Sequence, residues 1–174
     1  MNLSLAITAI GEDRPGIVNE LTEFLHSAHL NIEDSRMSIL GGEFAIILLV
    51  SGDRAAIESV TQQKDSLESS LNLNLLIRKT ASKSASDELI SYKINVEGMD
   101  NPGIVHKLTR YLSQHSINIV NMQTSSSHAA HTGTPVFTVN MLVDIPVNKN
   151  IQQIQEEFGL LCDDLNMDAD FSPA

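Results

Sequence analysis

The sequence predicts an α+β protein that contains two copies of one ferredoxin-like unit, each with the order βαββαβ. Three observations lead to this fold class. First, GEDRPGIVNEL at residues 11–21 returns as GMDNPGIVHKL at residues 98–108, with seven of eleven positions identical. Second, the residues around each stretch follow strand and helix periods. Third, a polar segment, TASKSASD at residues 80–87, separates the copies.

From the first strand to the start of the second, the two copies are related by one constant offset. Leu25 lies 87 residues before Leu112, and Asn31 lies 87 residues before Asn118. A period of this length exceeds that of solenoid repeats and suits a small domain. Because TASKSASD has no apolar period, we expect a linker there. We therefore predict one domain at 1–80, a linker at 81–87 and a second domain at 88–174.

The first half of each copy is predicted as strand, helix, strand. Residues 3–10 alternate in period two, as a half-buried strand does. Pro15 is expected at the first position of a helix whose apolar residues recur at steps of three and four. Residues 30–40 are predicted as a polar strand, and its charges suit the edge of a sheet.

The second half of each copy is predicted as strand, helix, strand. After a hairpin turn at Gly41-Gly42, the apolar residues 43–51 are expected to form a central strand. One helix is predicted over the apolar positions of 57–71, and a fourth strand over 71–80. The second copy repeats this order with strands at 89–97, 118–125, 136–144 and near 166–171, and helices at 103–115 and 151–161. Each copy is thus expected to form an antiparallel four-stranded sheet with both helices on one face.

The composition narrows the classes of partner and compartment. Eleven Lys and Arg stand against 22 Asp and Glu, a net charge of −11, which argues against a nucleic-acid-binding face. A single cysteine, Cys162, excludes an internal disulfide and a CxxC site, and we expect it to be buried and inert. The N-terminus lacks a signal peptide pattern, and the longest apolar run, 44–50, is too short to span a membrane. We expect a soluble, cytoplasmic protein.

The histidines do not predict a metal or catalytic centre. His128 and His131 lie three residues apart in a predicted loop, with no Cys or carboxylate nearby, whereas zinc sites use three or four protein ligands. His115 is expected at a helix C-terminus, where it complements the dipole. No histidine is set against a Ser or Cys nucleophile. We predict no metal, no cofactor and no catalytic residue.

The repeated turn before the first helix suits a small anion. Gly16 and Gly103 would leave the amides of the first helical turn open, and an open helix N-terminus attracts anions. The spacing matches neither nucleotide-binding glycine pattern. Asp13 and Asn31, with their twins, offer side-chain oxygens that suit an ammonium group beside a carboxylate. The alternative is that Pro-Gly here is only good turn chemistry.

The pattern D-[RN]-P-G-I-V, followed by a helix with leucines at matching steps, by LNIEDSR or INIVNMQ and by a βαββαβ frame, resembles the ACT domain. The resemblance implies an amino-acid-sensing module whose ligand lies at the turn between the first strand and the first helix, often between two such domains. Carried over by position, the implied ligand-binding residues are Asp13, Arg14, Gly16, Ile17 and Asn31 in the first copy, and Asp100, Asn101, Gly103, Ile104 and Asn118 in the second.

The two copies differ at Arg14 and Asn101. An asparagine can cap the helix and accept an ammonium proton, and an arginine can do neither. We therefore expect the second copy to bind the amino acid and the first to serve assembly.

The resemblance further implies a non-enzymatic regulator. For tandem proteins of this kind it implies a glycine-responsive repressor of the glycine cleavage operon, which binds a transcriptional activator protein and does not contact DNA. The acidic balance agrees with this expectation. The expected partners are a small amino acid, glycine favoured, and an activator protein, with no membrane. Edge strands such as 31–40 could also pair within the chain or across a homo-oligomer.

Other functions remain open at this point. The chain could be a tandem ACT interaction module that regulates another protein or enzyme, with both turns purely structural. It could also be a small enzyme similar to acylphosphatase, with Arg14 and Asn31 on the phosphate, although its glycine-rich loop does not match GEDRPGIV. The acidic stretch at 156–171 is either a solvated surface or a docking surface for a partner.

Overall fold

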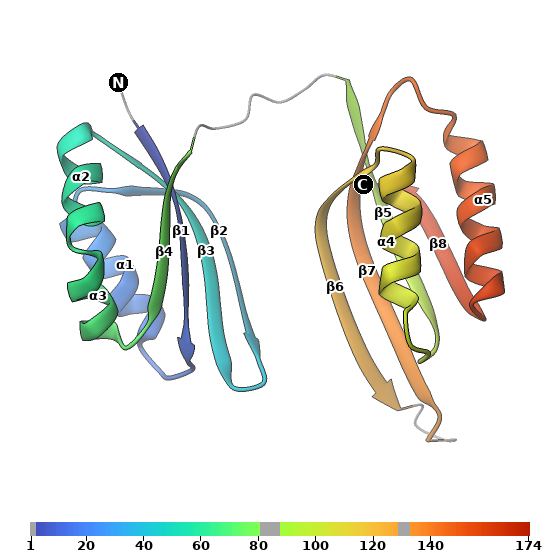
Figure 1. Ribbon diagram of the computed structural model, residues 1–174, viewed down its shortest axis with the longest axis horizontal. Coiled ribbons are helices and arrows are strands. Elements are labelled where there is room, and N and C mark those ends of the chain that lie inside the picture. Colours follow the sequence, from blue (N-terminus) through green and yellow to red (C-terminus); the bar gives the residue numbers. More distant parts are fainter. Residues whose placement is uncertain (1–2, 81–87, 129–132) are drawn as a thin grey trace. The chain divides into compact units, whose positions relative to one another are not determined.

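The computed structural model describes residues 3–80, 88–128 and 133–174. The chain divides into two compact units, Met1–Ser84 and Ala85–Ala174 (Figure 1). The predicted linker at 81–87 lies outside the described residues. Each unit is therefore described by itself.

The first unit has the predicted strand and helix order around one antiparallel sheet. Its strands lie in the order β2-β3-β1-β4. The polar strand β2 is at an edge and the apolar strand β3 is central, as predicted. The elements are β1 (Leu3–Glu12), α1 (Ile17–Ser27), β2 (Asn31–Leu40), β3 (Glu43–Gly52), α2 (Arg54–Gln62), α3 (Lys64–Leu71) and β4 (Asn74–Thr80).

The prediction of one continuous second helix in this unit was wrong. The helix is divided at Gln63 into α2 and α3. At the break the N–H of Gln63 donates to the carbonyl of Ser59, and its side-chain amide donates to the Ser59 hydroxyl at 2.7 Å. Ile57 and Leu67, on either side of the break, are both buried, so both short helices contribute to the core.

The second unit repeats the arrangement with the strand order β6-β7-β5-β8. Strand β6 extends to His128, so the expectation that this histidine lies in a loop was wrong, and His131 lies outside the described residues. The elements are β5 (Leu89–Met99), α4 (Ile104–Gln114), β6 (Asn118–His128), β7 (Pro135–Pro146), α5 (Ile151–Asp164) and β8 (Met167–Pro173). The predicted α+β, ferredoxin-like class is confirmed in both units.

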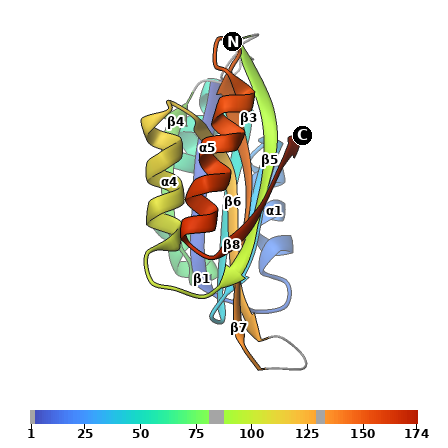
Figure 2. The ribbon, with the colours of Figure 1, turned by 90° about the vertical axis from the view of Figure 1, so that its right-hand side faces the viewer.

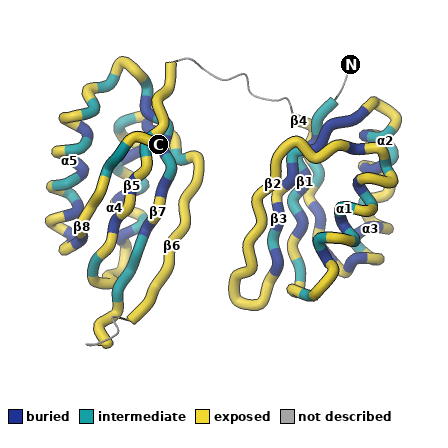
Figure 3. Tube along the Cα trace, turned by 180° about the vertical axis from the view of Figure 1, so that it is seen from behind, coloured by how far each residue is buried: buried dark blue, intermediate teal, exposed yellow. Residues whose placement is uncertain are grey.

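Each unit has its core between the sheet and its helices. Helices α4 and α5 lie on the same face of the second sheet (Figure 2), and α1, α2 and α3 cover one face of the first. Alternate strand residues point into this layer, and Leu5, Ile7 and Ala9 of β1 are almost fully buried. The other face of each sheet carries no helix, and the edge strands β2 and β6 are exposed along their length (Figure 3).

Two glycines allow the chain to pass close to β1 and β5. A Cβ on Gly98 would lie 2.5 Å from the carbonyl oxygen of Asn166, and one on Gly11 would lie 2.9 Å from that of Asn72. Real Cβ atoms do not approach backbone oxygens this closely. Glycine is therefore required at both positions so that the last strand of each unit can begin beside the first.

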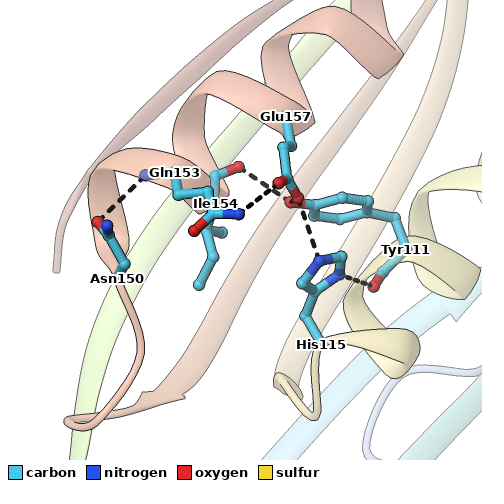
Figure 4. Close-up of polar contacts among 6 residues, drawn as sticks. All are labelled: Tyr111, His115, Asn150, Gln153, Ile154 and Glu157. Carbon is cyan, nitrogen blue, oxygen red and sulfur yellow. Dashed lines mark hydrogen bonds and ion pairs between the residues drawn. The ribbon is translucent and has the colours of Figure 1, made fainter.

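A polar cluster joins the two helices of the second unit (Figure 4). The Tyr111 hydroxyl of α4 lies 3.2 Å from a carboxylate oxygen of Glu157 on α5, and His115 Nε2 lies 3.2 Å from the same oxygen. The side-chain amide of Gln153 donates to the other oxygen at 2.8 Å. The hydrogen bond from Gln153, with those from Tyr111 and His115, lowers the pKa of the Glu157 carboxyl below its ordinary value.

Candidate functional site

The two repeated turns have the same backbone conformation. Helix α1 begins after Gly16, with φ of 90°, and α4 begins after Gly103, with φ of 88°. This left-handed conformation is open to glycine and strained for most other residues. Because the glycines are the N-cap residues, the expectation that Pro15 is the first residue of the helix was wrong.

No side chain caps either helix. Neither α1 nor α4 has a side-chain hydrogen bond at its N-cap. The expectation that Asn101 caps α4 was therefore wrong, and its side-chain amide donates instead to the carbonyl of Met99 at 3.3 Å. In α1 the first amide, that of Ile17, donates to the carbonyl of Arg14 at 3.4 Å. In α4 the amides that follow Gly103 are left for another acceptor, and the positive end of the dipole favours an anion there.

The first turn carries its own anion. The Arg14 guanidinium donates to both oxygens of the Glu20 carboxylate, at 2.6 Å each. This hydrogen-bonded pair lowers the pKa of the Glu20 carboxyl and raises that of Arg14. A Cβ added to Gly16 would lie 3.6 Å from a Glu20 oxygen. This carboxylate therefore lies beside the N-cap of α1.

The second turn has a different charge and more space. Asn101 stands in place of Arg14, and Lys107 stands in place of Glu20. No described atom lies within 4 Å of a Cβ built on Gly103. The Asp100 carboxylate accepts a hydrogen bond from the Ser126 hydroxyl of β6, at 3.3 Å. The second turn therefore combines an uncovered helix N-terminus with a cation in the first helical turn.

The structure brings most, but not all, of the predicted site residues together. Asp13, Arg14, Gly16 and Ile17 form one turn, as do their counterparts in the second unit. Ile17 and Ile104 are buried, so only their backbone is available to a ligand.

Asn31 and Asn118 lie at the other end of the sheets. Asn31 pairs with Ser51, whereas Gly11 pairs with Phe44, and Asn118 pairs with Asp144, whereas Gly98 pairs with Phe137. The intervening strand is seven or more residues long, which corresponds to more than about 20 Å. One unit alone therefore does not surround a single small ligand with both its turn and its asparagine.

The two asparagines also differ in their surroundings. The Asn31 amide donates to the Glu33 carboxylate at 3.0 Å, and that carboxylate also accepts the Ser51 hydroxyl. These hydrogen bonds lower the pKa of the Glu33 carboxyl. In the second unit Val120 occupies the place of Glu33, so Asn118 has no carboxylate at this position.

A shallow groove lies beside each asparagine, between the end of the first helix and the edge strand. This groove was not predicted from the sequence. In the first unit Thr22, His26, Asn31 and Ile32 are among its lining residues. The groove of the second unit is lined by the residues 87 positions later, namely Thr109, Ser113, Asn118 and Ile119. The same offset could have indicated a shared groove, because Thr22 and Thr109 are identical.

The described residues do not form the acylphosphatase-like pair. Arg14 and Asn31 lie at opposite ends of one sheet, so the pair required by an acylphosphatase-like site does not assemble within the unit. Cys162 is buried as predicted, and burial raises the pKa of its thiol to about 11. Among described residues there is no cluster of three metal-ligating side chains, and none of the helices found in them is long and apolar enough to cross a membrane.

Comparisons with known proteins agree on both units. The family model described as "ACT domain" matches at residues 4–79, and a second model with the same description matches at 92–159. The chain is 30% identical to the glycine cleavage system transcriptional repressor of Escherichia coli (strain K12), over 93% of this chain and 85% of that protein.

Two crystal structures resemble the whole chain. One is an unknown protein from Galdieria sulphuraria, with 28% identity and a TM-score of 0.87, covering 100% of this chain and 99% of that one. The other is a protein proposed to be a glycine cleavage system transcriptional repressor, with 28% identity and a TM-score of 0.74, covering 99% and 97%.

Proposed function

Because the chain belongs to the ACT domain family, we propose that it is a glycine-responsive repressor of the glycine cleavage operon, which acts by binding a transcriptional activator protein. Membership of this family supports an amino-acid-sensing regulator. The repressor relative supports the finer assignment, because the similarity extends over both units.

The observation that carries the sensing role is the contrast between the two turns. The α1 turn is accompanied by the Arg14–Glu20 ion pair, which has no net charge and holds a carboxylate oxygen beside Gly16, where the carboxylate of a ligand would have to lie. The α4 turn has Lys107 at the same position, so both the helix dipole and the side chain favour an anion. We assign the amino-acid carboxylate to the second turn, at the amides that follow Gly103.

The ammonium group of the ligand is assigned to side-chain oxygens. Asp100 and Asn101 supply them at the turn itself. Because Asn31 and Asn118 lie at the far ends of their sheets, a further asparagine reaches the ligand only from the edge strand of another unit. Edge-to-edge pairing of β2 or β6 across a dimer would provide this arrangement.

The protein partner is supported by the charge of the chain. A net charge of −11 opposes binding to the phosphate backbone, so repression through an activator protein is more consistent with the sequence than repression through DNA. In this scheme glycine shifts the chain toward a form with lower affinity for the activator.

The test is affinity capture of the full chain from its native lysate, with and without glycine. The proposal predicts that a transcriptional activator is retained without glycine and is released when glycine is added. Retention of an enzyme, or retention of the activator regardless of glycine, would instead support the interaction module. A gel-shift assay with the operator of the operon is expected to show no direct binding.

A further inference from the structure

The open face of the first sheet has an apolar centre. Ile10, Ile47 and Leu76 are 45%, 49% and 59% exposed. The strand register brings them together, because Thr8 lies opposite both Ile47 and Leu76, and Ile10 lies two residues further along β1. We call Ala6, Ile10, Ala45, Ile47, Leu49 and Leu76 the open-face patch.

The second unit is an internal control for this patch. Glu97 takes the place of Ile10, and Asn140 takes the place of Ile47, since it pairs with Asn95 as Ile47 pairs with Thr8. Asp168, which pairs with Glu97, adds another charge on the same face. The same fold therefore forms with a polar open face, and the apolar patch of the first sheet is not required for folding. A contiguous exposed apolar surface of this kind marks an interaction site.

The polar face of the second sheet is a poor cover for the patch. Packing the two faces together would bury Glu97 and Asp168 against Ile10 and Leu76 without partners, at a high free-energy cost. A second copy of the patch has the uncharged Thr8 at its centre, and the charged Arg36, which lies opposite Ile47 on the edge strand β2, forms an ion pair with Asp34. Apolar side chains would then face apolar side chains, as they do between the sheets of a sandwich.

The charges around the patch fit a particular symmetry. Asp34 of β2 and Arg78 of β4 lie at one level of the sheet, because Asp34 pairs with Leu49, Leu49 with Ala6, and Ala6 with Arg78. A two-fold axis parallel to the strands places β2 of one copy over β4 of the other. Because this rotation does not move residues along the strand direction, residues at one level of the first sheet face residues at the same level of the second copy. Asp34 of each copy, which forms an ion pair with Arg36 of its own strand, then faces Arg78 of the other copy, with opposite charge. Arg36 lies at the level of Leu76 of the other copy, at the edge of the interface.

We propose that the open-face patch is a dimer interface, in which two copies of this chain pack their first sheets face to face about a two-fold axis parallel to the strands. The interface has an apolar centre and a polar rim, the usual anatomy of specific association. It leaves the edge strands β2 and β6 unpaired, so it is separate from the edge-to-edge contact suggested for the ligand.

The test is sedimentation velocity of the full chain over a concentration series. The wild type is expected to dimerise, and Ile47→Asn is expected to raise the dimer dissociation constant roughly tenfold or more, because each interface loses two apolar anchors. Asn is already tolerated at the equivalent position, Asn140, so the variant should fold. The matched control is Leu160→Asn on α5, a residue 66% exposed, which should leave the dissociation constant unchanged.

A charge-swap cycle tests the symmetry. Asp34→Arg and Arg78→Asp should each weaken the dimer, and the double variant should dimerise more tightly than either single variant. A double variant weaker than both would overturn the proposed axis. A wild type that stays monomeric throughout the series, or a dimer that Ile47→Asn does not weaken, would overturn the interface itself.

Discussion

The Glu20 carboxylate accepts hydrogen bonds from the two terminal guanidinium nitrogens of Arg14, at 2.6 Å each, beside the glycine turn that begins α1. In the second unit neither residue is retained, and Asn101 and Lys107 take their places. The same backbone turn thus carries a neutral Arg–Glu ion pair in one unit, and an asparagine and a lysine in the other. This difference divides the units between assembly and sensing in our proposal.

The glycines of the two turns provide a matched pair of variants. Gly16→Ala and Gly103→Ala should each lower the free energy of unfolding by about 1 kcal/mol, because both positions have positive φ. Only Gly103→Ala should weaken glycine binding, since its Cβ would stand next to the Ile104 amide, the first amide of the proposed site. Chemical denaturation and calorimetry measure the two effects. Loss of stability without any change in glycine binding in Gly103→Ala would favour the purely structural reading of the turns.

Two other glycines of the second unit should respond in opposite directions. Gly98→Ala places a Cβ 2.5 Å from a backbone oxygen, so we expect a loss of stability of about 2 kcal/mol or more. Gly159 lies inside α5 with no described atom within 4 Å of an added Cβ. Gly159→Ala should raise stability by about 0.5–1 kcal/mol, because alanine favours a helix. Similar unfolding curves for both variants would contradict the close approach at Gly98.

Acid should weaken the contact between α4 and α5. The pKa of Glu157 is lowered in the folded state, so its ionised form stabilises the fold at neutral pH. That contribution is lost as the pH falls below 4.5, the ordinary value for a glutamate, and into the range of the lowered pKa. Glu157→Gln should therefore show a smaller loss of melting temperature between neutral and acidic pH than the wild type.

Tyrosine fluorescence measures this effect in the second unit alone. The chain has two tyrosines, Tyr92 and Tyr111, both in that unit, and no tryptophan. A control variant, Glu58→Gln on α2, changes a carboxylate of the first unit and should leave the tyrosine signal unaffected. Parallel pH profiles for the wild type and Glu157→Gln would exclude a role for this carboxylate.

Much of the fold could be predicted because each element has a local signature. The apolar period identified the strands, and the repeat at an offset of 87 supported the first strand, the first helix and the start of the second strand in both copies. The polarity of 30–40 correctly placed β2 at an edge. The break at Gln63 was missed, because Ile57, Val60, Leu67 and Leu71 keep helical spacing across it.

The candidate site was less predictable, since it depends on backbone conformation and chain direction. That Gly16 is the N-cap follows from its positive φ, which no local pattern specified. The pair between Arg14 and Glu20 requires the same turn geometry. The position of Asn31 could have been inferred, because a strand that follows one strand and one returning helix begins at the starting end of the first strand. The shared motif of the two copies does not contain this direction, so it places Asn31 next to the turn.

The most direct test of the central claim is isothermal titration of glycine into the wild type and into an Asn101→Arg/Lys107→Glu variant, which gives the second turn the charges of the first. The reverse variant, Arg14→Asn/Glu20→Lys, is the control for the first turn. We predict that the wild type binds glycine, that the first variant loses binding while its tyrosine signal and melting temperature are retained, and that the control still binds. Glycine binding that is unchanged in Asn101→Arg/Lys107→Glu would contradict the assignment of the ligand to the second turn.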